Sequence, residues 1–363
     1  YPYSIVLGLT LLLQFYMGYM ISIFVVLYAF YYVSPRLSIE GTWKVKLKHY
    51  VQPLWKAFVY SVLGAATASI LLVPVFFNLL ESKGQIGGAM TFSFAFQINP
   101  LDILSKLSIG GFDNASGWSA GPNLPNIYIG ALGFIGYILF LTSTKIAKER
   151  KWAAGGVTLV FLVSFVNEFV SKIWHMGQNP AGFFFRFSWI FSFFMLILAY
   201  QVLKEKIEIS RQGKLLAATV LVLSAIYLYT KDFTYLPKTQ PEVLTQFITN
   251  HFVIFVVLLI IGTAAGFYLY WDRSLKTKKE KKIVLLIAIS IILVLAGLLL
   301  TGYLFSRVVL TLIIYLAVLA LLRPRMNRLA VLTLSALTVF ELGYNAYLSQ
   351  VTLGYADVDK FVD

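Results

Sequence analysis

The sequence has 363 residues, of which 59% are hydrophobic and 13% charged, and its mean hydropathy is +0.79. Soluble globular chains carry about 25% charged residues, so this composition excludes an ordinary water-soluble domain. The net charge of +14 does not indicate nucleic acid binding, because the basic residues stand in short runs between apolar stretches, as in membrane proteins. The absence of Cys excludes disulfides, thiolate metal sites and cysteine nucleophiles.

Apolar runs long enough to cross a bilayer recur along the chain, since about 20 apolar residues span the hydrocarbon core as a helix. These runs predict an all-α fold, a polytopic transmembrane helix bundle of about ten spans. Pro74 should kink the second span near its end. The predicted spans are residues 3–32, 55–80, 126–144, 154–174, 185–203, 214–230, 251–271, 283–301, 306–322 and 329–348.

Lys and Arg are concentrated in every second connection between the predicted spans, and so at one end of the spans. The connections that follow the first, third, fifth, seventh and ninth spans, together with the span ends beside them, hold 22 of the 30 basic residues. Because basic residues favour the cytoplasmic side, the loops at 81–125 and 175–184 are expected outside. Residues 1–348 would then form the bundle, and 349–363 would begin an extracytoplasmic segment.

The loop at 81–125 is rich in Gly and Pro. Within it, Asn99-Pro100-Leu101-Asp102 has the features of a helix start: an Asn cap, Pro at the first position and an acidic residue in the first turn. This predicts a short helix in the membrane interface, or a loop that packs on the bundle. Further polar side chains from this region could hydrogen-bond a sugar or cap turns: Asp113, Asn114, Asn123, Asn126 and Tyr128.

The fourth span carries ionisable residues on one helix face. Glu168, Lys172 and His175 are spaced i, i+4 and i+7. Trp174 suits the membrane interface, which would place Glu168 about 9 Å deeper along a straight helix. A carboxylate at such depth faces either a partner or a water-filled cavity. The spacing is therefore consistent with a simple ion pair to Lys172 or with a functional cavity.

A second polar loop follows this span and contains Asn179, and Arg186 enters the fifth span beside three Phe residues. Arg307 is similarly placed at the start of the ninth span. If the helices meet, these two Arg residues, Lys172 and His175 would form a cluster of cations suited to a phosphate at headgroup depth.

Several common catalytic signatures are missing. The sequence has no G-x-x-x-x-G-K-[ST] phosphate loop, no H-E-x-x-H and no G-x-S-x-G. Asp357 and Asp359 form a lone D-x-D pair, which gives little reason to expect a metal site. We therefore predict no metal ligands and name no certain cofactor, and a need for a divalent cation is left open.

Three stretches make the sequence resemble the YfhO family of bacterial membrane proteins. They are Phe15-Tyr16-Met17-Gly18-Tyr19-Met20; Gly111-Phe112-Asp113-Asn114 followed by Leu124-Pro125-Asn126-Ile127-Tyr128-Ile129-Gly130; and Trp174-His175 followed by Pro180 and Phe185-Arg186-Phe187. The resemblance implies a glycosyltransferase of the GT-C type in the bacterial plasma membrane. Such an enzyme takes a sugar from a polyprenyl-phosphate carrier, usually undecaprenyl phosphate, and transfers it to an extracytoplasmic glycopolymer such as teichoic acid.

The resemblance also suggests roles for individual residues. Glu168 and Asp113 are the candidate catalytic carboxylates. The candidate lipid-phosphate-binding residues are Lys172, His175, Arg186 and Arg307, and the residues expected to position the sugar or its loops are Asn114, Asn123, Asn126, Tyr128 and Asn179. GT-C enzymes usually carry an essential acidic residue just after their first span, and this sequence is expected to begin several spans later. N-terminal spans and a C-terminal domain would thus lie outside it.

Two other functions remain compatible with the sequence. A transporter or flippase for a lipid-linked or anionic substrate would also need intramembrane charges and kinked spans. It predicts polar residues that continue through the membrane midplane. A structural or assembly subunit would use the outer loops only to bind partners.

Overall fold

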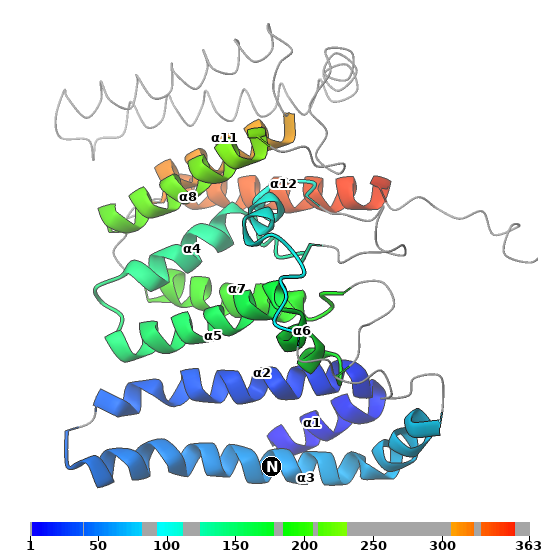
Figure 1. Ribbon diagram of the computed structural model, residues 1–363. Coiled ribbons are helices and arrows are strands. Elements are labelled where there is room, and N and C mark those ends of the chain that lie inside the picture. Colours follow the sequence, from blue (N-terminus) through cyan, green and yellow to red (C-terminus); the bar gives the residue numbers. More distant parts are fainter. Residues whose placement is uncertain are drawn as a thin grey trace, which may run out of the picture. The chain divides into compact units, whose positions relative to one another are not determined.

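The computed structural model describes residues 2–38, 40–81, 93–111, 124–177, 184–205, 210–230, 306–322 and 328–352 (Figure 1). Across these residues the chain is helical, and its one β-bridge joins Phe96 to Asn167. The predicted all-α membrane fold is therefore confirmed. The spans predicted at 251–271 and 283–301 lie outside the described residues.

Among the described residues, four helical stretches are long and apolar enough to cross a membrane: Phe15–Leu37, Trp43–Val75, Arg211–Leu228 and Ala330–Gln350. Shorter apolar helices accompany them at Pro2–Leu13, Gly130–Thr142, Ser188–Lys204 and Leu310–Leu321.

The chain divides into two compact units, and each is described by itself. The first contains Tyr1–Ile103, Ser116–Ile127 and Phe140–Val202, and the second contains Leu104–Ala115, Tyr128–Leu139 and Leu203–Asp363. The helices of the first unit are α1 (Pro2–Leu13), α2 (Phe15–Val33), η1 (Ser34–Ser38), α3 (Trp43–Glu81), α5 (Lys148–Val166), α6 (Glu168–Trp174) and α7 (Ser188–Lys204), the last of which ends just beyond it.

The predicted first span, 3–32, is not one helix. It is divided at Gln14, which has an extended backbone with φ −153° and ψ 88°, into α1 and α2. At this bend a Cβ added to Gly18 would lie 3.0 Å from Leu11 Cα, so the absent side chain permits the close turn. With 12 residues, α1 extends about 18 Å, which is shorter than the hydrocarbon core.

Small residues bring α1 and α3 together. A Cβ on Gly64 of α3 would lie 2.9 Å from the Ser4 carbonyl oxygen, and one on Gly8 would lie 2.4 Å from Thr67 Oγ1. Tyr3 and Ser61 share a hydrogen bond of 2.6 Å. In membrane proteins, where lipid gives no hydrophobic advantage to helix contact, such close approach supplies the packing energy.

Aromatic rings fill the centre of the first unit. Phe24 of α2 lies 6.4 Å from Phe161 of α5 and 6.1 Å from Phe194 of α7, measured between ring centroids. Toward the C-terminal end of α2, Tyr31 donates a hydrogen bond to Gln201 Oε1 at 3.0 Å, and the Arg150 guanidinium lies 5.5 Å from the Tyr31 ring. We call this end of the unit, which carries Arg36, Lys148 and Arg150, the basic end.

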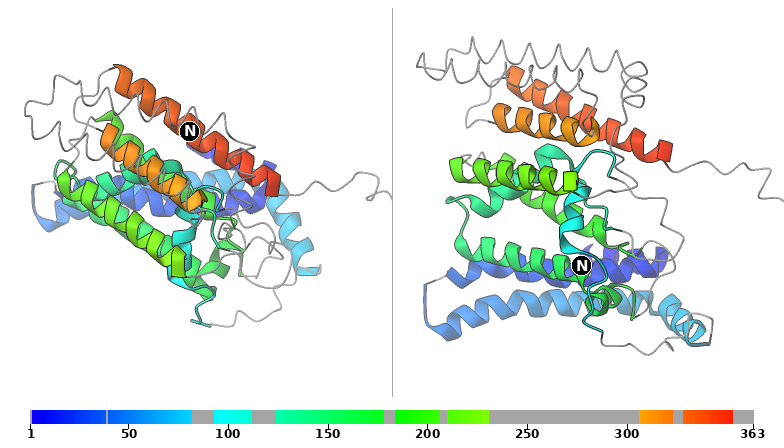
Figure 2. Two further views of the ribbon diagram at one scale, coloured as in Figure 1. Left: turned by 90° about the horizontal axis from the view of Figure 1, so that it is seen from above. Right: turned by 45° about the horizontal axis from the view of Figure 1, so that its top comes forward.

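The second unit contains α4 (Gly130–Thr142, which ends in the first unit), α8 (Arg211–Thr230), α11 (Ser306–Leu321) and α12 (Arg328–Thr352), together with the second half of η2 (Pro100–Leu107). Helices α11 and α12 contact each other and lie side by side in both figures (Figure 2). Lys214 of α8 donates to the Leu319 and Leu322 carbonyl oxygens at 2.8 and 2.7 Å, which satisfies the open end of α11.

Two predictions at element ends can be compared directly with the structure. The helix start at Asn99 is confirmed, since Asn99 Oδ1 accepts a hydrogen bond from Leu101 N at 3.0 Å at the beginning of η2. Helix α12 continues to Thr352, beyond residue 348 where the last span is predicted to end.

Candidate functional site

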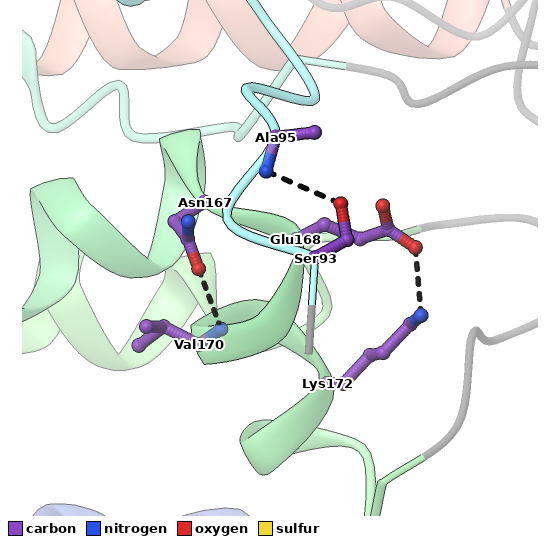
Figure 3. A network of polar contacts seen from close by, with 6 residues as sticks. All are labelled: Ser93, Ala95, Asn167, Glu168, Val170 and Lys172. Carbon is purple, nitrogen blue, oxygen red and sulfur yellow. Dashed lines mark hydrogen bonds and ion pairs between the residues drawn. The ribbon is translucent and has the colours of Figure 1, made fainter. Parts of the chain in front are cut away.

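A break in the predicted fourth span builds the candidate site of the first unit. Helix α5 ends at Val166, Asn167 adopts an extended conformation with φ −97° and ψ 125°, and α6 begins at Glu168. Asn167 Oδ1 accepts a hydrogen bond from Val170 N at 3.0 Å and so caps α6 (Figure 3). The prediction of one continuous helix over 154–174 is therefore wrong.

The segment 93–97 satisfies the backbone groups that this break releases. Gln97 N donates to the Val166 carbonyl oxygen at 2.9 Å, and Glu168 N donates to the Ala95 carbonyl oxygen at 3.3 Å. The Gln97 side-chain amide donates to the Phe165 carbonyl oxygen at 3.1 Å. Inside a bilayer an unpaired backbone group costs several kcal/mol, so this segment makes the break possible.

Glu168 and Lys172 form an ion pair across one turn of α6. Glu168 Oε1 and Lys172 Nζ are 2.7 Å apart, and both side chains are drawn in Figure 3. The Lys172 side chain is 9% exposed and that of Glu168 is 29% exposed. Of the two alternatives for this spacing, the structure shows the ion pair, with the carboxylate as its more accessible member.

The expected position of Trp174 is wrong. The indole is 2% exposed, lies 4.8 Å from the Phe187 ring and 5.1 Å from the Phe161 ring, and donates to Ser164 Oγ at 2.9 Å. Trp174 is therefore a core residue that joins α6 to α5 and to the start of α7. The depth of Glu168 calculated from an interfacial Trp174 on a straight helix consequently does not apply.

The chain reverses immediately after α6. Met176 and Gly177 both have positive φ, 57° and 83°, and Gly177 N donates to the Lys172 carbonyl oxygen at 2.8 Å. This is the usual way in which a left-handed residue closes a helix C-terminus. A left-handed Met is uncommon and indicates that the turn is strongly held in place.

The turn places His175 against Tyr16, which is 159 residues away in the sequence. His175 Nε2 is 2.6 Å from the Phe184 carbonyl oxygen, so it donates to that oxygen, and Nδ1 accepts from the Tyr16 hydroxyl at 2.6 Å. Burial, helped by the nearby Arg186 and opposed by the hydrogen bond to the Phe184 carbonyl oxygen, lowers the pKa of His175 to about 4. The ring is therefore neutral near pH 7.

Arg186 completes the group. Its guanidinium carbon lies 5.4 Å from the centre of the Tyr16 ring, in a cation–π arrangement. Tyr19 of the same helix donates to the Ile173 carbonyl oxygen at 2.8 Å. We call Tyr16, Glu168, Lys172, His175 and Arg186 the α6 site. It lies at the end of the first unit opposite the basic end, because α2 and α5 each run between the two ends (Figure 1).

The structure relates the remaining predicted site residues to this group as follows. Asn126 is exposed, and Arg307 and Tyr128 belong to the second unit. Asp113, Asn114, Asn123 and Asn179 lie outside the described residues.

In the second unit, Arg307 helps to fix a tight turn. Its Nη1 donates to the Gly110 carbonyl oxygen at 3.3 Å, while Gly110 N donates to Asn345 Oδ1 at 2.8 Å. Ile109 N donates to Thr311 Oγ1 at 2.9 Å. A Cβ on Gly110, whose φ is +68°, would lie 3.1 Å from the Arg307 side chain. The turn therefore joins the end of η2 to α11 and α12.

Glu341, a fully buried carboxyl group in α12, is not among the site residues predicted from the sequence. It accepts hydrogen bonds from the Tyr128 hydroxyl at 2.6 Å and from Ala131 N at 2.8 Å, at the start of α4. The rule that drew attention to Glu168, an acidic residue inside an apolar run, applies equally to Glu341. The sequence does not show that Glu341 accepts hydrogen bonds at the start of the distant helix α4.

Comparison with known proteins identifies one family. The model of the family described as "Bacterial membrane protein YfhO" matches residues 1–361. No curated protein and no solved structure matches the chain significantly.

Proposed function

Because the chain belongs to the YfhO family of bacterial membrane proteins, we propose that it forms part of a glycosyltransferase that uses a polyprenyl-phosphate-linked sugar. The acceptor would be an extracytoplasmic envelope glycopolymer such as teichoic acid. In this proposal the α6 site binds the phosphate of the lipid carrier at the outer face of the plasma membrane.

The observation that carries the proposal is the grouping of Arg186 and Lys172 at the end of the first unit away from its basic end. Basic residues at the basic end orient a membrane protein, whereas cations at the other end have no such role. A guanidinium binds two phosphate oxygens at once, and an ammonium adds a point charge. This combination suits a phosphate monoester or diester at headgroup depth.

The transfer step can be written from these groups. The acceptor hydroxyl oxygen forms a bond to the anomeric carbon, the bond from that carbon to the phosphate oxygen breaks, and the hydroxyl proton passes to a carboxylate. Arg186 and Lys172 stabilise the negative charge that develops on the departing phosphate. Glu168 orients Lys172 through their ion pair, and Asp113 remains a candidate for the base.

We propose a positioning role for His175 in place of phosphate binding. A neutral ring with both nitrogens hydrogen-bonded within the chain contributes no positive charge to a phosphate at pH 7. We assign it instead to holding Tyr16, and through the Tyr16 ring the Arg186 guanidinium, in place. Arg307 remains a proposed phosphate ligand of the second unit.

The proposal is tested by transfer of radiolabelled sugar from polyprenyl phosphate to envelope polymer in membranes that contain the full-length protein. We expect Arg186→Gln to lower transfer by about 100-fold or more, as expected for loss of a charge that stabilises the transition state. Lys148→Gln is the matched control, because it removes an exposed cation at the basic end, and it should leave transfer unchanged. Equal activity of Arg186→Gln and the wild type would remove Arg186 from the site.

One observation favours the transporter as a second candidate. Glu341 places a buried carboxyl group well inside α12, next to the start of α4, and ionisable residues inside membrane helices commonly mark transport pathways. Reconstituted vesicles distinguish the two functions. Movement of a fluorescent lipid-linked sugar across the bilayer without any product would support the transporter, and product formation on one face would support the transferase.

A further inference from the structure

Helix α3 is longer than a membrane span requires. Its 39 residues extend about 58 Å, whereas the hydrocarbon core is about 30 Å thick. The contacts of α1 are with the later part of α3, at Ser61, Gly64 and Thr67. The first 14 residues, Trp43–Lys56, therefore form a separate portion of about 21 Å, which we call the leading segment of α3.

The leading segment is amphipathic. Trp43, Leu47, Val51, Leu54 and Phe58 follow one another at intervals of four or three residues and so lie along one stripe of the helix. The apolar stripe is uncovered, since Trp43 is 68%, Leu47 50% and Phe58 56% exposed. At 100° per residue, Lys44, Lys46 and Lys48 flank this stripe, and His49, Gln52 and Lys56 lie opposite it.

Pro53, near the end of the leading segment, interrupts the hydrogen-bond ladder of α3. A Pro has no N–H, so the carbonyl oxygen of His49, four residues earlier, lacks its usual helical donor. Arg36 Nη1 lies 3.3 Å from that oxygen and donates to it. The Arg36 side chain thus joins η1 to the leading segment and adds a further positive charge beside it.

The charge of the segment points to an anionic partner. Residues 41–80 contain no Asp or Glu, and the leading segment contains four Lys residues. The leading segment continues directly into the membrane-spanning part of α3. The lipid headgroups are therefore the anionic surface that is always close to it. Basic residues next to a span attract anionic lipids, and flanking Lys side chains can extend to headgroups while the stripe between them enters the acyl boundary.

We propose that the leading segment of α3 is a binding surface for anionic phospholipid. The apolar stripe from Trp43 to Phe58 enters the leaflet, and the flanking lysines bind the headgroup phosphates of lipids such as phosphatidylglycerol. This proposal concerns the basic end of the first unit and does not depend on the reaction at the α6 site.

Because the sequence lacks Cys, a single introduced thiol can report the position of the segment. Leu47→Cys on the stripe and Gln52→Cys on the opposite face are labelled with an environment-sensitive fluorophore in the full-length protein. Each variant is reconstituted into vesicles of pure phosphatidylcholine and into vesicles of phosphatidylcholine mixed with phosphatidylglycerol. Brominated acyl chains then measure contact with lipid by quenching.

We expect the label at position 47 to shift to the blue and to be quenched in the phosphatidylglycerol vesicles only, and the label at position 52 to stay in water. Replacing Lys44 and Lys48 together by Gln should lower the ratio of lipid-bound to free label about 30-fold, because each Lys near an anionic surface contributes about 1 kcal/mol. High salt should have the same effect on the wild type.

The matched control replaces Lys145 and Lys148 by Gln, which removes the same charge from the connection before α5 and from its first residue. It should leave the label at position 47 unchanged. Equal quenching in both kinds of vesicle, equal behaviour of positions 47 and 52, or an equal effect of the control pair would each overturn the proposal. A water-exposed label at position 47 in both kinds of vesicle would instead indicate a protein partner for this surface.

Discussion

His175 shows how one side chain can be fixed by two distant partners. Its ring lies between the Phe184 carbonyl oxygen and the Tyr16 hydroxyl, and it is 3% exposed. Protonation would place a second donor against the Tyr16 hydroxyl and a positive charge beside Arg186. The neutral ring is thus part of what holds the α6 site together.

The pH dependence of stability follows from the lowered pKa. The ring protonates near its ordinary pKa of 6.5 in the unfolded chain but only near 4 in the folded chain. The unfolded state therefore binds more protons in this window, and stability falls as the pH decreases from 6.5 toward 4. Between pH 7 and pH 5 we expect a loss of about 2 kcal/mol in wild type beyond that in His175→Gln. Thermal unfolding in detergent at both pH values measures this difference, and identical slopes for the two proteins would contradict it.

Glu341 has a comparable role in the second unit, where it holds the start of α4. Replacement by Ala leaves the Tyr128 hydroxyl and Ala131 N without their acceptor, so we expect a loss of about 2–4 kcal/mol. Tyr128→Phe should cost only about 1 kcal/mol, because the carboxylate keeps its bond to Ala131. Denaturant unfolding of both single variants and the double variant measures the coupling. Tyr347→Phe at a half-exposed ring is the control, and additivity of the two single effects would argue against the described contact.

Among the elements, the interrupted helix α5–α6 depends on a segment far from it in sequence. Asn167 caps α6, and residues 93–97 supply the partners that a continuous helix would otherwise have provided. The cap is a local contact within residues 167–170, whereas the pairing with Ala95 and Gln97 forms only when distant parts of the chain come together. Together they orient α6 so that its last residues reach Tyr16.

The contact of α1 with α3 gives a prediction for a pair of helices. Gly64→Ala places a methyl group about 2.9 Å from the Ser4 carbonyl oxygen, so one helix must move and the expected cost is about 1–3 kcal/mol. Gly156→Ala in α5 is the matched control, since its Cβ meets nothing within 4 Å, and it should be neutral or slightly stabilising. Thermal unfolding of the two variants side by side measures the difference. Equal effects would show that the close approach does not limit packing.

For the whole molecule, the distribution of basic residues predicts which ends of the helices face outward. Leu101, 52% exposed at the start of η2, should lie outside the cell, and exposed Lys148 at the start of α5 should lie inside. Single cysteines at these positions can be treated with a membrane-impermeant maleimide on intact cells. We expect labelling at position 101 at once and at position 148 only after permeabilisation. The reverse pattern would invert the topology and with it the proposed outer-face site.

Local chemistry explains why parts of the site could be predicted. Glu168 and Lys172 are one turn apart, so their ion pair follows from helical spacing alone. The Asn99 cap of η2 follows from the short polar side chain of Asn. Trp174 was placed wrongly because an amphipathic ring suits both an interface and a core with a polar partner. Contacts with Ser164 and Phe187 place Trp174 in the core, and the sequence alone does not show that these residues lie close to it.

The sequence by itself determined the all-α membrane fold and most span positions, because the cost of exposing polar groups to lipid acts on every residue separately and is visible as an apolar run. Only the tertiary structure decided where α1–α2 and α5–α6 break, that Tyr16 meets His175 and Arg186, and that Glu341 serves α4. Apart from the α1–α2 bend, where Gly18 meets Leu11, these features depend on partners 70 to 210 residues apart, such as the pairs Ala95–Glu168 and Ala131–Glu341. A polar residue in an apolar run indicates that a partner is needed, but only folding selects which one.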